Sequence, residues 1–141
     1  MKEFIAQALV LGCTERRNDR TADLFTLELG RGHARMVGGA AITSIFSAHC
    51  SPLNLLTTRL VKKNRYTLAD AVTEDRFTLL RHSRRAFAEG LEALFALRTL
   101  LADEEPDPRL FHEVRRALEK GALTVRGILA LLGVRLELAI E

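Results

Sequence analysis

Residues 20–41 read RTADLFTLELGRGHARMVGGAA, and this stretch predicts the central pair of strands of the fold. From Ala22 the residue types alternate as they do along a half-buried strand. One side of that strand is expected to carry Phe25, Leu27 and Leu29. A second run at 33–37 follows a glycine-containing break at 30–32, which predicts a hairpin whose turn uses glycine at positive φ.

The composition is that of a globular chain with a small basic excess. The 141 residues are 48% hydrophobic and 28% charged, proportions that are ordinary for a folded domain. The two cysteines, Cys13 and Cys50, make neither a disulfide framework nor a metal-ligand pair, so we expect the protein to occupy a reducing compartment of the cell. Cys13 is expected to be a buried strand residue. The first apolar run, at 4–11, is too short to span a bilayer and has no cleavage signature. We therefore expect a cytoplasmic protein with no membrane partner.

Five short strands are predicted in the first half of the chain. In chain order they lie at 4–14, 22–29, 33–37, 53–61 and 66–72. The polar stretch 15–23 is expected to be a loop, and 42–52 a short helical turn or an irregular crossing. Five strands with glycine corners and a long crossing between the third and the fourth indicate a Greek-key barrel of the OB type.

The hydrophobic period changes to that of helices at Asp75. Three-and-four spacing predicts one long helix at about 75–102. Asp107 followed by Pro108 predicts the start of a second helix, and a third, apolar nearly all round, is expected at about 123–132. The second helix is expected to bury Leu110, Phe111, Val114 and Leu118.

The predicted fold class is thus α+β, with a five-stranded OB-fold barrel followed by a three-helix module. The barrel is placed at 1–74 as a nucleic-acid-binding domain, and the helical module at 75–141 as a protein-interaction domain.

Basic residues concentrate in the barrel half. Between Arg16 and Arg65 there are nine Lys and Arg and three Asp and Glu, an excess of six against three for the whole chain. In an OB barrel the loop after strand 1 and the loop between strands 4 and 5 flank one binding face. Solvated, charged turns are the simpler interpretation of such residues. The alternative is a DNA-binding face formed by Arg16, Arg17, Arg20, Arg31, Arg35, Lys62, Lys63, Arg65 and Tyr66.

Two stretches resemble a known family. The run ALVLGCTERRNDRTADLFTLELGRGHARMVGGAA, with Thr21-Ala22-Asp23 and Gly38-Gly39-Ala40 as landmarks, resembles the opening of the bacterial recombination mediator family RecO. EPDPRLFHEVRRALEKG followed by LTVRGILALLGVRLEL is similar to that family's helical segment. The likeness departs at 42–52, which has no Lys or Arg where the family is usually very basic. The sequence ends at Glu141, about where many members continue into a cysteine-bearing, zinc-binding region, so we expect no metal site in these residues.

The resemblance implies a protein of DNA repair and recombination that responds to DNA damage. Such proteins bind single- and double-stranded DNA, promote annealing, and support recombinase loading together with the ring-forming partner RecR. They also dock the acidic, apolar tail of the single-strand DNA-binding protein on their helices. Candidate residues for clamping a carboxylate there are Arg98, Arg115, Arg116 and Arg126.

No residue pattern predicts catalysis, a cofactor or a metal site. The four histidines are dispersed, there is no HExxH motif, and the glycines at 30–32 lack the spacing of a phosphate-binding loop. We therefore expect a protein that is not an enzyme. Two alternatives to a DNA-binding protein stay open: an adaptor with an OB fold but little DNA affinity, favoured by the uncharged 42–52 segment, and a barrel that binds a small molecule.

Overall fold

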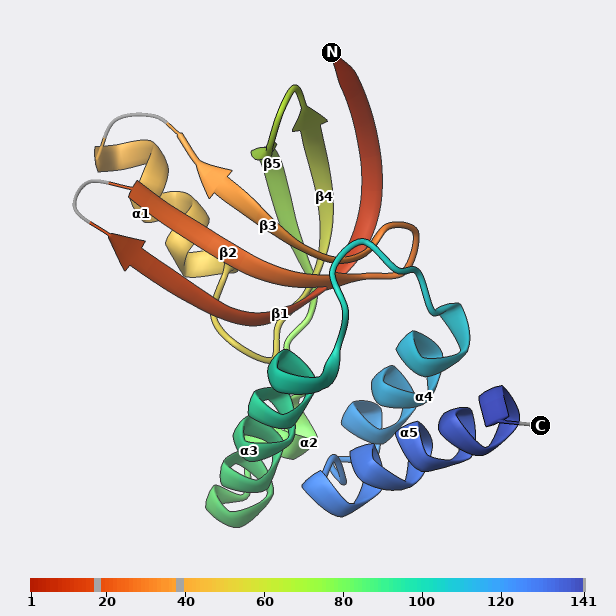
Figure 1. Ribbon diagram of the computed structural model, residues 1–141. Coiled ribbons are helices and arrows are strands. Elements are labelled where there is room, and N and C mark those ends of the chain that lie inside the picture. The colour runs from red at the N-terminus through yellow and green to blue at the C-terminus, as the bar shows by residue number, and fades with distance from the viewer. Residues whose placement is uncertain (17–18, 38–39, 141) are drawn as a thin grey trace. The chain divides into compact units, whose positions relative to one another are not determined.

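The computed structural model shows an α+β chain with five strands and five helices in its described part (Figure 1). It describes the backbone of residues 1–16, 19–37 and 40–140, and the side chains of residues 1–15, 19–37 and 45–133. The strands are β1 (Lys2–Arg16), β2 (Asp19–Thr26), β3 (Gly30–Met36), β4 (Leu55–Lys62) and β5 (Tyr66–Asp75). The helices are α1 (Ala40–His49), α2 (Thr78–Arg81), α3 (Arg84–Leu100), α4 (Pro108–Glu119) and α5 (Val125–Ile140). The α+β class predicted from sequence is confirmed.

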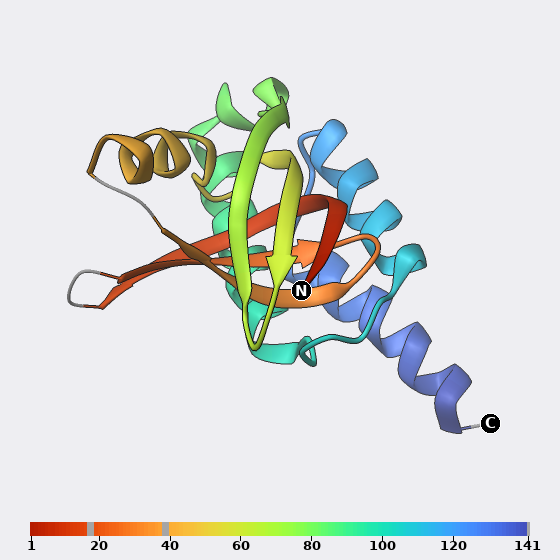
Figure 2. The same cartoon turned by 90° about the horizontal axis from the view of Figure 1, so that it is seen from above.

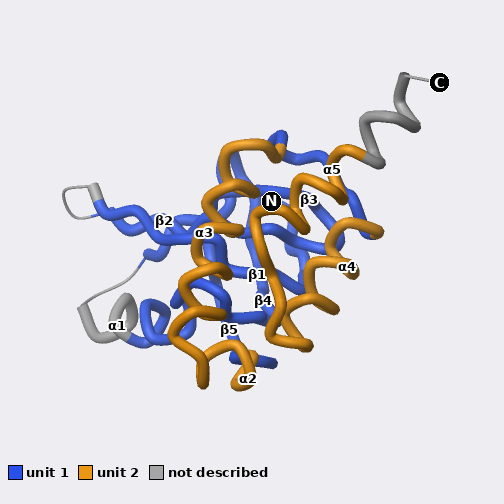
Figure 3. The backbone as a smooth tube through the Cα atoms, turned by 90° about the horizontal axis from the view of Figure 1, so that it is seen from below, with its two compact units in different colours: residues 1–76, 102–108 blue, residues 77–101, 109–141 orange. Residues whose placement is uncertain are grey.

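The chain divides into two compact units, shown in different colours in Figure 3. The barrel unit comprises residues 1–76 and 102–108, and the helical unit comprises residues 77–101 and 109–141. Residues 102–108, which we call the acidic segment, therefore return to the barrel unit after α3. Sequence reasoning places these residues in the helical module instead.

The five strands close into a barrel in the order β1-β2-β3-β5-β4 (Figure 2). All neighbours are antiparallel except β3 and β5, which run parallel. Their pairing covers Ala34 with Tyr66, Arg35 with Thr67, and Met36 with Leu68. Because parallel strands cannot be joined by a tight turn, the chain between β3 and β5 needs a long crossover, and it carries α1 and β4.

The hairpin predicted from residues 20–41 is present, but its turn lies at 27–29 rather than at 30–32. Thr26 fixes this position, because its hydroxyl donates to the Gly30 carbonyl at 2.8 Å and accepts from the Leu29 amide at 2.9 Å. Gly30 has a φ of 77°, as expected of a glycine at a turn. It begins β3.

The loop predicted at 15–23 is wrong, because β1 and β2 continue to pair out to Arg16 and Asp19. Residues 13–15 are exposed along this part of β1. Antiparallel pairing satisfies the backbone of the polar residues, so their side chains reach water without a loop.

The barrel interior is lined mainly by small and aliphatic side chains. On β1 these are Ala6, Ala8 and Val10, and on β2 they are Ala22 and Leu24. Phe25 is buried as well, but strand alternation places it on the opposite face of β2. Phe46 of α1 and Cys50, which directly follows that helix, complete this core. The crossing predicted at 42–52 is thus largely helical, and α1 closes part of the barrel.

The helical unit keeps the predicted order, with changed bounds. The long helix predicted at 75–102 is divided into α2 and α3, because the Ser83 side chain accepts a hydrogen bond from the Ala86 amide at 3.2 Å and caps α3. The start of α4 at Pro108 is as predicted, and Gly121, with φ of 67°, follows its end. The apolar face of α4 is buried as expected, and its residues are Leu110, Phe111, Val114 and Leu118.

The last helix is longer than predicted and less enclosed. It continues to Ile140, past the predicted end at about residue 132. Ile128 is buried, but Leu129 is 53% exposed, so α5 presents an apolar residue to solvent. Within the described residues, no helix has the length and apolar character needed to cross a membrane.

The two cysteines test the closure of the barrel by α1. Cys13 is exposed, contrary to the sequence expectation, whereas burial of Cys50 raises the pKa of its thiol to about 12. A thiol-reactive disulfide reagent at about pH 8 should therefore modify Cys13 and spare Cys50, because the thiolate is the reacting form. Unfolding in denaturant should make both react. Rapid modification of Cys50 in the native protein would contradict the packing of α1 against the core.

Candidate nucleic-acid interface

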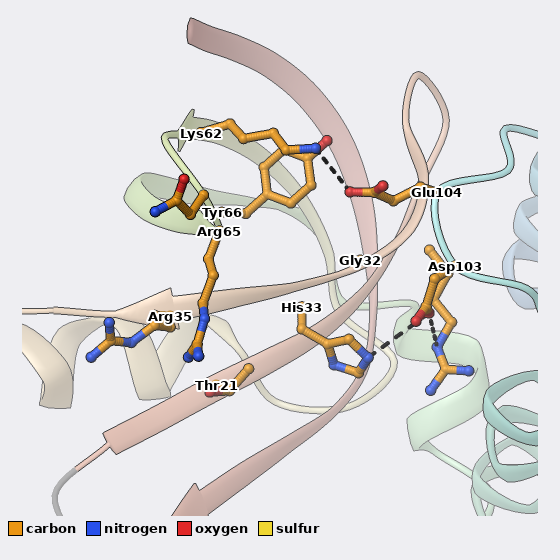
Figure 4. Close-up of a pocket in the computed structure, with 11 residues that line it drawn as sticks. Thr21, Gly32, His33, Arg35, Lys62, Arg65, Tyr66, Asp103 and Glu104 are labelled. Atoms are coloured by element: carbon orange, nitrogen blue, oxygen red, sulfur yellow. Dashed lines mark hydrogen bonds and ion pairs between the residues drawn. The ribbon is translucent and has the colours of Figure 1, made fainter. Parts of the chain in front are cut away.

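A hollow of about 440 Å³ opens on the barrel where β3 meets the turn between β4 and β5 (Figure 4). We call it the basic hollow. Its lining residues are Thr21, Arg31, Gly32, His33, Arg35, Lys62, Asn64, Arg65, Tyr66, Asp103 and Glu104. The hollow therefore combines residues of β2, β3, the end of β4, the β4–β5 turn, the start of β5 and the acidic segment.

Strand geometry explains why these residues meet. Arg31, His33 and Arg35 alternate along β3 and so share one face, opposite the face that carries the buried Ala34 and Met36. The parallel pairing of β3 with β5 sets the start of β5, and hence the preceding turn, beside this face. The hollow thus depends on closure of the barrel.

Two arginines, Arg35 of β3 and Arg65 of the β4–β5 turn, line the open part of the hollow. Figure 4 shows the Arg65 side chain running from the turn toward Arg35 and Thr21. The same residues, with His33, also line a second hollow of about 410 Å³ that reaches Thr14 and Asp19. A guanidinium group pairs well with a phosphate or carboxylate in bidentate geometry. The arrangement therefore offers an anion two guanidinium groups, a hydroxyl and an imidazole.

These two arginines differ in their partners. Arg35 Nη2 lies 3.1 Å from Asp19 Oδ1, in an exposed pair of a kind that contributes little to stability. Arg65 forms no ion pair or hydrogen bond with a side chain in the described part of the chain. Arg65 is therefore the cation of the hollow that is most open to an external anion.

The other side of the hollow is neutralised by carboxylates. Arg31 donates from Nε and Nη2 to the buried Asp23 carboxylate, at 3.1 and 2.9 Å. Lys62 Nζ lies 3.0 Å from Glu104 Oε1, and this hydrogen bond raises the pKa of the Lys62 ammonium group. Asp103 Oδ1 lies 3.8 Å from Arg31 Nε and 3.9 Å from His33 Nε2. The acidic segment thus faces three basic side chains of the hollow.

Backbone contacts also hold the acidic segment against β3. The Glu104 amide donates to the Arg31 carbonyl at 2.8 Å, and Asp103 forms an isolated parallel bridge with Arg31. Beside them, a Cβ atom added to Gly30 would lie 2.5 Å from the carbonyl carbon of Glu105. The glycine at the start of β3 therefore leaves space for the segment.

Tyr66 offers less open ring surface than sequence reasoning expects of a stacking platform. Its ring packs edge-on against Phe4, with centroids 6.2 Å apart, and Lys62 Nζ lies 4.8 Å from its centroid. Phe46, another aromatic residue of the barrel unit, is buried in the barrel core and presents no ring surface for stacking. A ligand in the hollow would consequently be held more by charge than by stacking.

The residues predicted for DNA binding separate into three groups. Five of them line the hollow: Arg31, Arg35, Lys62, Arg65 and Tyr66. Arg20 instead bonds to the Ser47 hydroxyl of α1 and lies 3.5 Å from Glu15, while Lys63 is exposed in the turn and does not line the hollow. Arg17 and the side chain of Arg16 lie outside the described residues.

Sequence reasoning missed several lining residues: Thr21, Gly32, His33, Asn64, Asp103 and Glu104. Thr21 pairs with Arg35 across the hairpin, so a correct strand register would have found it. No local sequence signal places the acidic segment beside β3.

The helical unit has a groove of about 400 Å³ between α4 and α5. Arg116 is one of its lining residues and pairs with Glu113 at 2.8 Å; Lys120, Leu123 and Leu131 also line it. The other predicted partner-binding residues are Arg98 in α3, Arg115, which pairs with Glu119 in α4, and Arg126 in α5. They are not among the residues lining this groove.

Titratable residues do not gather into a metal site in the described part of the chain. No group of three or more His, Cys, Asp and Glu side chains there is placed to hold an ion.

Replacing Gly30 with Ala should unseat the acidic segment. The new Cβ would meet the Glu105 backbone, and the positive φ would be strained, so we expect a loss of about 2 kcal/mol in unfolding free energy. Gly32→Ala is the matched control, because its Cβ would lie 3.7 Å from the Tyr66 ring at ordinary contact distance. Denaturant unfolding of both variants measures the difference. Equal stabilities would contradict the contact between Gly30 and Glu105.

Comparison with known proteins adds no family to this description. The chain matches no protein-family model, and a search of curated proteins finds no match. The functional assignment therefore rests on the residues and on the geometry of the basic hollow.

Proposed function

We propose that this chain is a non-catalytic, RecO-like protein of DNA repair and recombination whose OB-fold barrel binds the DNA backbone in the basic hollow. Two features of the barrel support the OB assignment: the Greek-key strand order, and the helix that bridges β3 and β4. OB barrels bind oligonucleotides on the face of strands 2 and 3, flanked by the loops after strands 1 and 4. The lining of the basic hollow includes residues of β2, β3 and the β4–β5 turn, which would be the corresponding elements of this chain.

The observation that carries the proposal is that Arg35 and Arg65 line the same two hollows together with Thr21. Two guanidinium groups that line one hollow repel each other, so their shared position does not stabilise the barrel by itself. Phosphates of a nucleic-acid backbone would relieve this repulsion and accept hydrogen bonds from both groups. The contacts are to phosphate rather than to bases, so binding is expected to tolerate any sequence.

In this role the protein would act in the cytoplasm, bind single- and double-stranded DNA, promote annealing, and support recombinase loading together with RecR. The resemblance to RecO supplies this role, and the basic hollow supplies its physical basis. The alternative is an adaptor with little DNA affinity. The carboxylates that neutralise Arg31 and Lys62 favour that alternative, because they reduce the charge available to DNA.

A titration by fluorescence anisotropy separates these possibilities. A single-stranded oligonucleotide of about 20 nucleotides should bind at about 50 mM salt, with log affinity falling by about 0.7 per phosphate contact for each unit of log salt. Arg35→Ala combined with Arg65→Ala should weaken DNA binding by about tenfold or more, and should flatten the slope of log affinity against log salt by about 1.4. Circular dichroism should show an intact fold.

Arg59→Ala is the matched control, since Arg59 lies on β4, pairs with Glu3 at 3.0 Å and does not line the hollow. Its affinity should match that of the unaltered protein. Failure of the unaltered protein to bind DNA at low salt would favour the adaptor. Equal losses in both variants would place the site elsewhere.

The helical unit supports a second proposal, the docking of the acidic, apolar tail of the single-strand DNA-binding protein. Basic residues Arg116 and Lys120 lie in the α4–α5 groove beside Leu123 and Leu131. Such a groove complements a peptide that ends in apolar residues and carboxylates.

A fluorescent peptide of that composition tests the docking directly. Arg116→Ala combined with Lys120→Ala should weaken binding of the peptide by about tenfold or more, because hydrogen bonds to charged groups contribute about 1.5–3 kcal/mol each. Arg115→Ala serves as the control, since Arg115 pairs with Glu119 and does not line the groove. Equal affinities for all three proteins would exclude this groove.

A further inference from the structure

We propose that the acidic segment is a built-in competitor for DNA at the basic hollow, and that it lowers the affinity of the barrel for a phosphate backbone. This inference rests on the proposed function, since it concerns the same site. Its basis is the position of two carboxylates, on Asp103 and Glu104, among the lining residues of a hollow that is otherwise basic (Figure 4).

The carboxylates occupy positions at which phosphates would be favourable. Glu104 holds the Lys62 ammonium group at 3.0 Å, and Asp103 approaches both Arg31 and His33 within 4 Å. A phosphate contacting these cations must exchange with a carboxylate, so each such contact gains less than one with a free cation. In the part of the chain that the structure describes, no carboxylate of the acidic segment forms an ion pair with Arg35 or Arg65, which line the open half of the hollow.

Backbone contacts hold the acidic segment in place, so its position does not depend on the charge of its carboxylates. The hydrogen bond from the Glu104 amide to the Arg31 carbonyl and the close fit of Glu105 on Gly30 do not involve a carboxylate. Neutralising Glu104 should therefore leave the segment in place while releasing Lys62. The Lys62–Glu104 pair is also well exposed, with 35% and 55% of the side chains accessible, so its loss has little effect on stability.

The experiment compares two variants that lose the same charge from adjacent positions. Glu104→Gln removes the carboxylate that contacts Lys62. Glu105→Gln removes one that is exposed and, in the described part of the chain, has no ion pair. Both are titrated against a single-stranded oligonucleotide by anisotropy across a salt series. Thermal unfolding checks that both remain folded.

Glu104→Gln should bind about fivefold more tightly than the unaltered protein at about 100 mM salt, because one additional phosphate contact steepens the salt slope by about 0.7. Glu105→Gln should differ from the unaltered protein by less than about twofold, since only the long-range field changes. Adding Asp103→Asn to Glu104→Gln should increase the affinity further by releasing Arg31 and His33 from that carboxylate.

The possible failures are distinguishable. Equal affinities for the unaltered protein and Glu104→Gln would overturn the competition while leaving DNA binding intact. Equal gains in Glu104→Gln and Glu105→Gln would also overturn it, because net charge rather than contact would then set the affinity. Absence of binding in all the proteins, the doubly neutralised variant included, would overturn both the proposed function and the competition.

Discussion

The parallel pairing of β3 with β5 is the constraint on which the rest of the barrel unit depends. It covers only three residue pairs, yet it closes the barrel, because the strands β1 to β3 and the hairpin of β4 and β5 are otherwise joined only by the pairing of β1 with β4. Without it, β3 and β5 would each present an unpaired edge, and the interior residues of the two hairpins would lie open to water. The same pairing sets the β4–β5 turn beside β3, and so brings Arg65 to Arg35.

The charges around the hollow fall into two kinds, distinguished by burial. The Arg31–Asp23 pair joins β3 to β2 through a carboxylate that is only 3% exposed, and removal of either partner would leave a buried charge or donor unmet. The pairs of Lys62 with Glu104 and of Arg35 with Asp19 are exposed, and they can exchange partners at little cost. Arg31 thus belongs chiefly to the fold, whereas Lys62, Arg35 and Arg65 remain available to an anion.

Local signals made part of the fold predictable. Alternation and a glycine at positive φ predicted the hairpin, and Asp107-Pro108 predicted the start of α4. The turn lies three residues earlier than predicted, because the Thr26 hydroxyl forms hydrogen bonds with backbone groups of the turn. Hydrophobic alternation does not reveal such bonds. The break before α3 depends on the Ser83 cap within an otherwise continuous apolar period.

The candidate site was less predictable than the fold, because it is built from contacts between distant parts of the chain. Charge counting found Arg35 and Arg65 but also selected Arg20, which the register directs to Ser47 of α1. It missed Asp103 and Glu104, whose position beside β3 requires knowledge of how the chain returns after α3. Composition identifies the basic residues, and only the three-dimensional arrangement shows which carboxylates oppose them.

The central claim, that DNA binds where the turn between β4 and β5 meets β3, is tested most directly by nuclear magnetic resonance. An isotopically labelled sample titrated with a short single-stranded oligonucleotide should show the largest amide shift changes at Thr21, His33, Arg35 and Arg65. Amides of β4 near Arg59 and of α4 should change little. Shift changes centred on the helices, or spread evenly over the surface, would contradict the account.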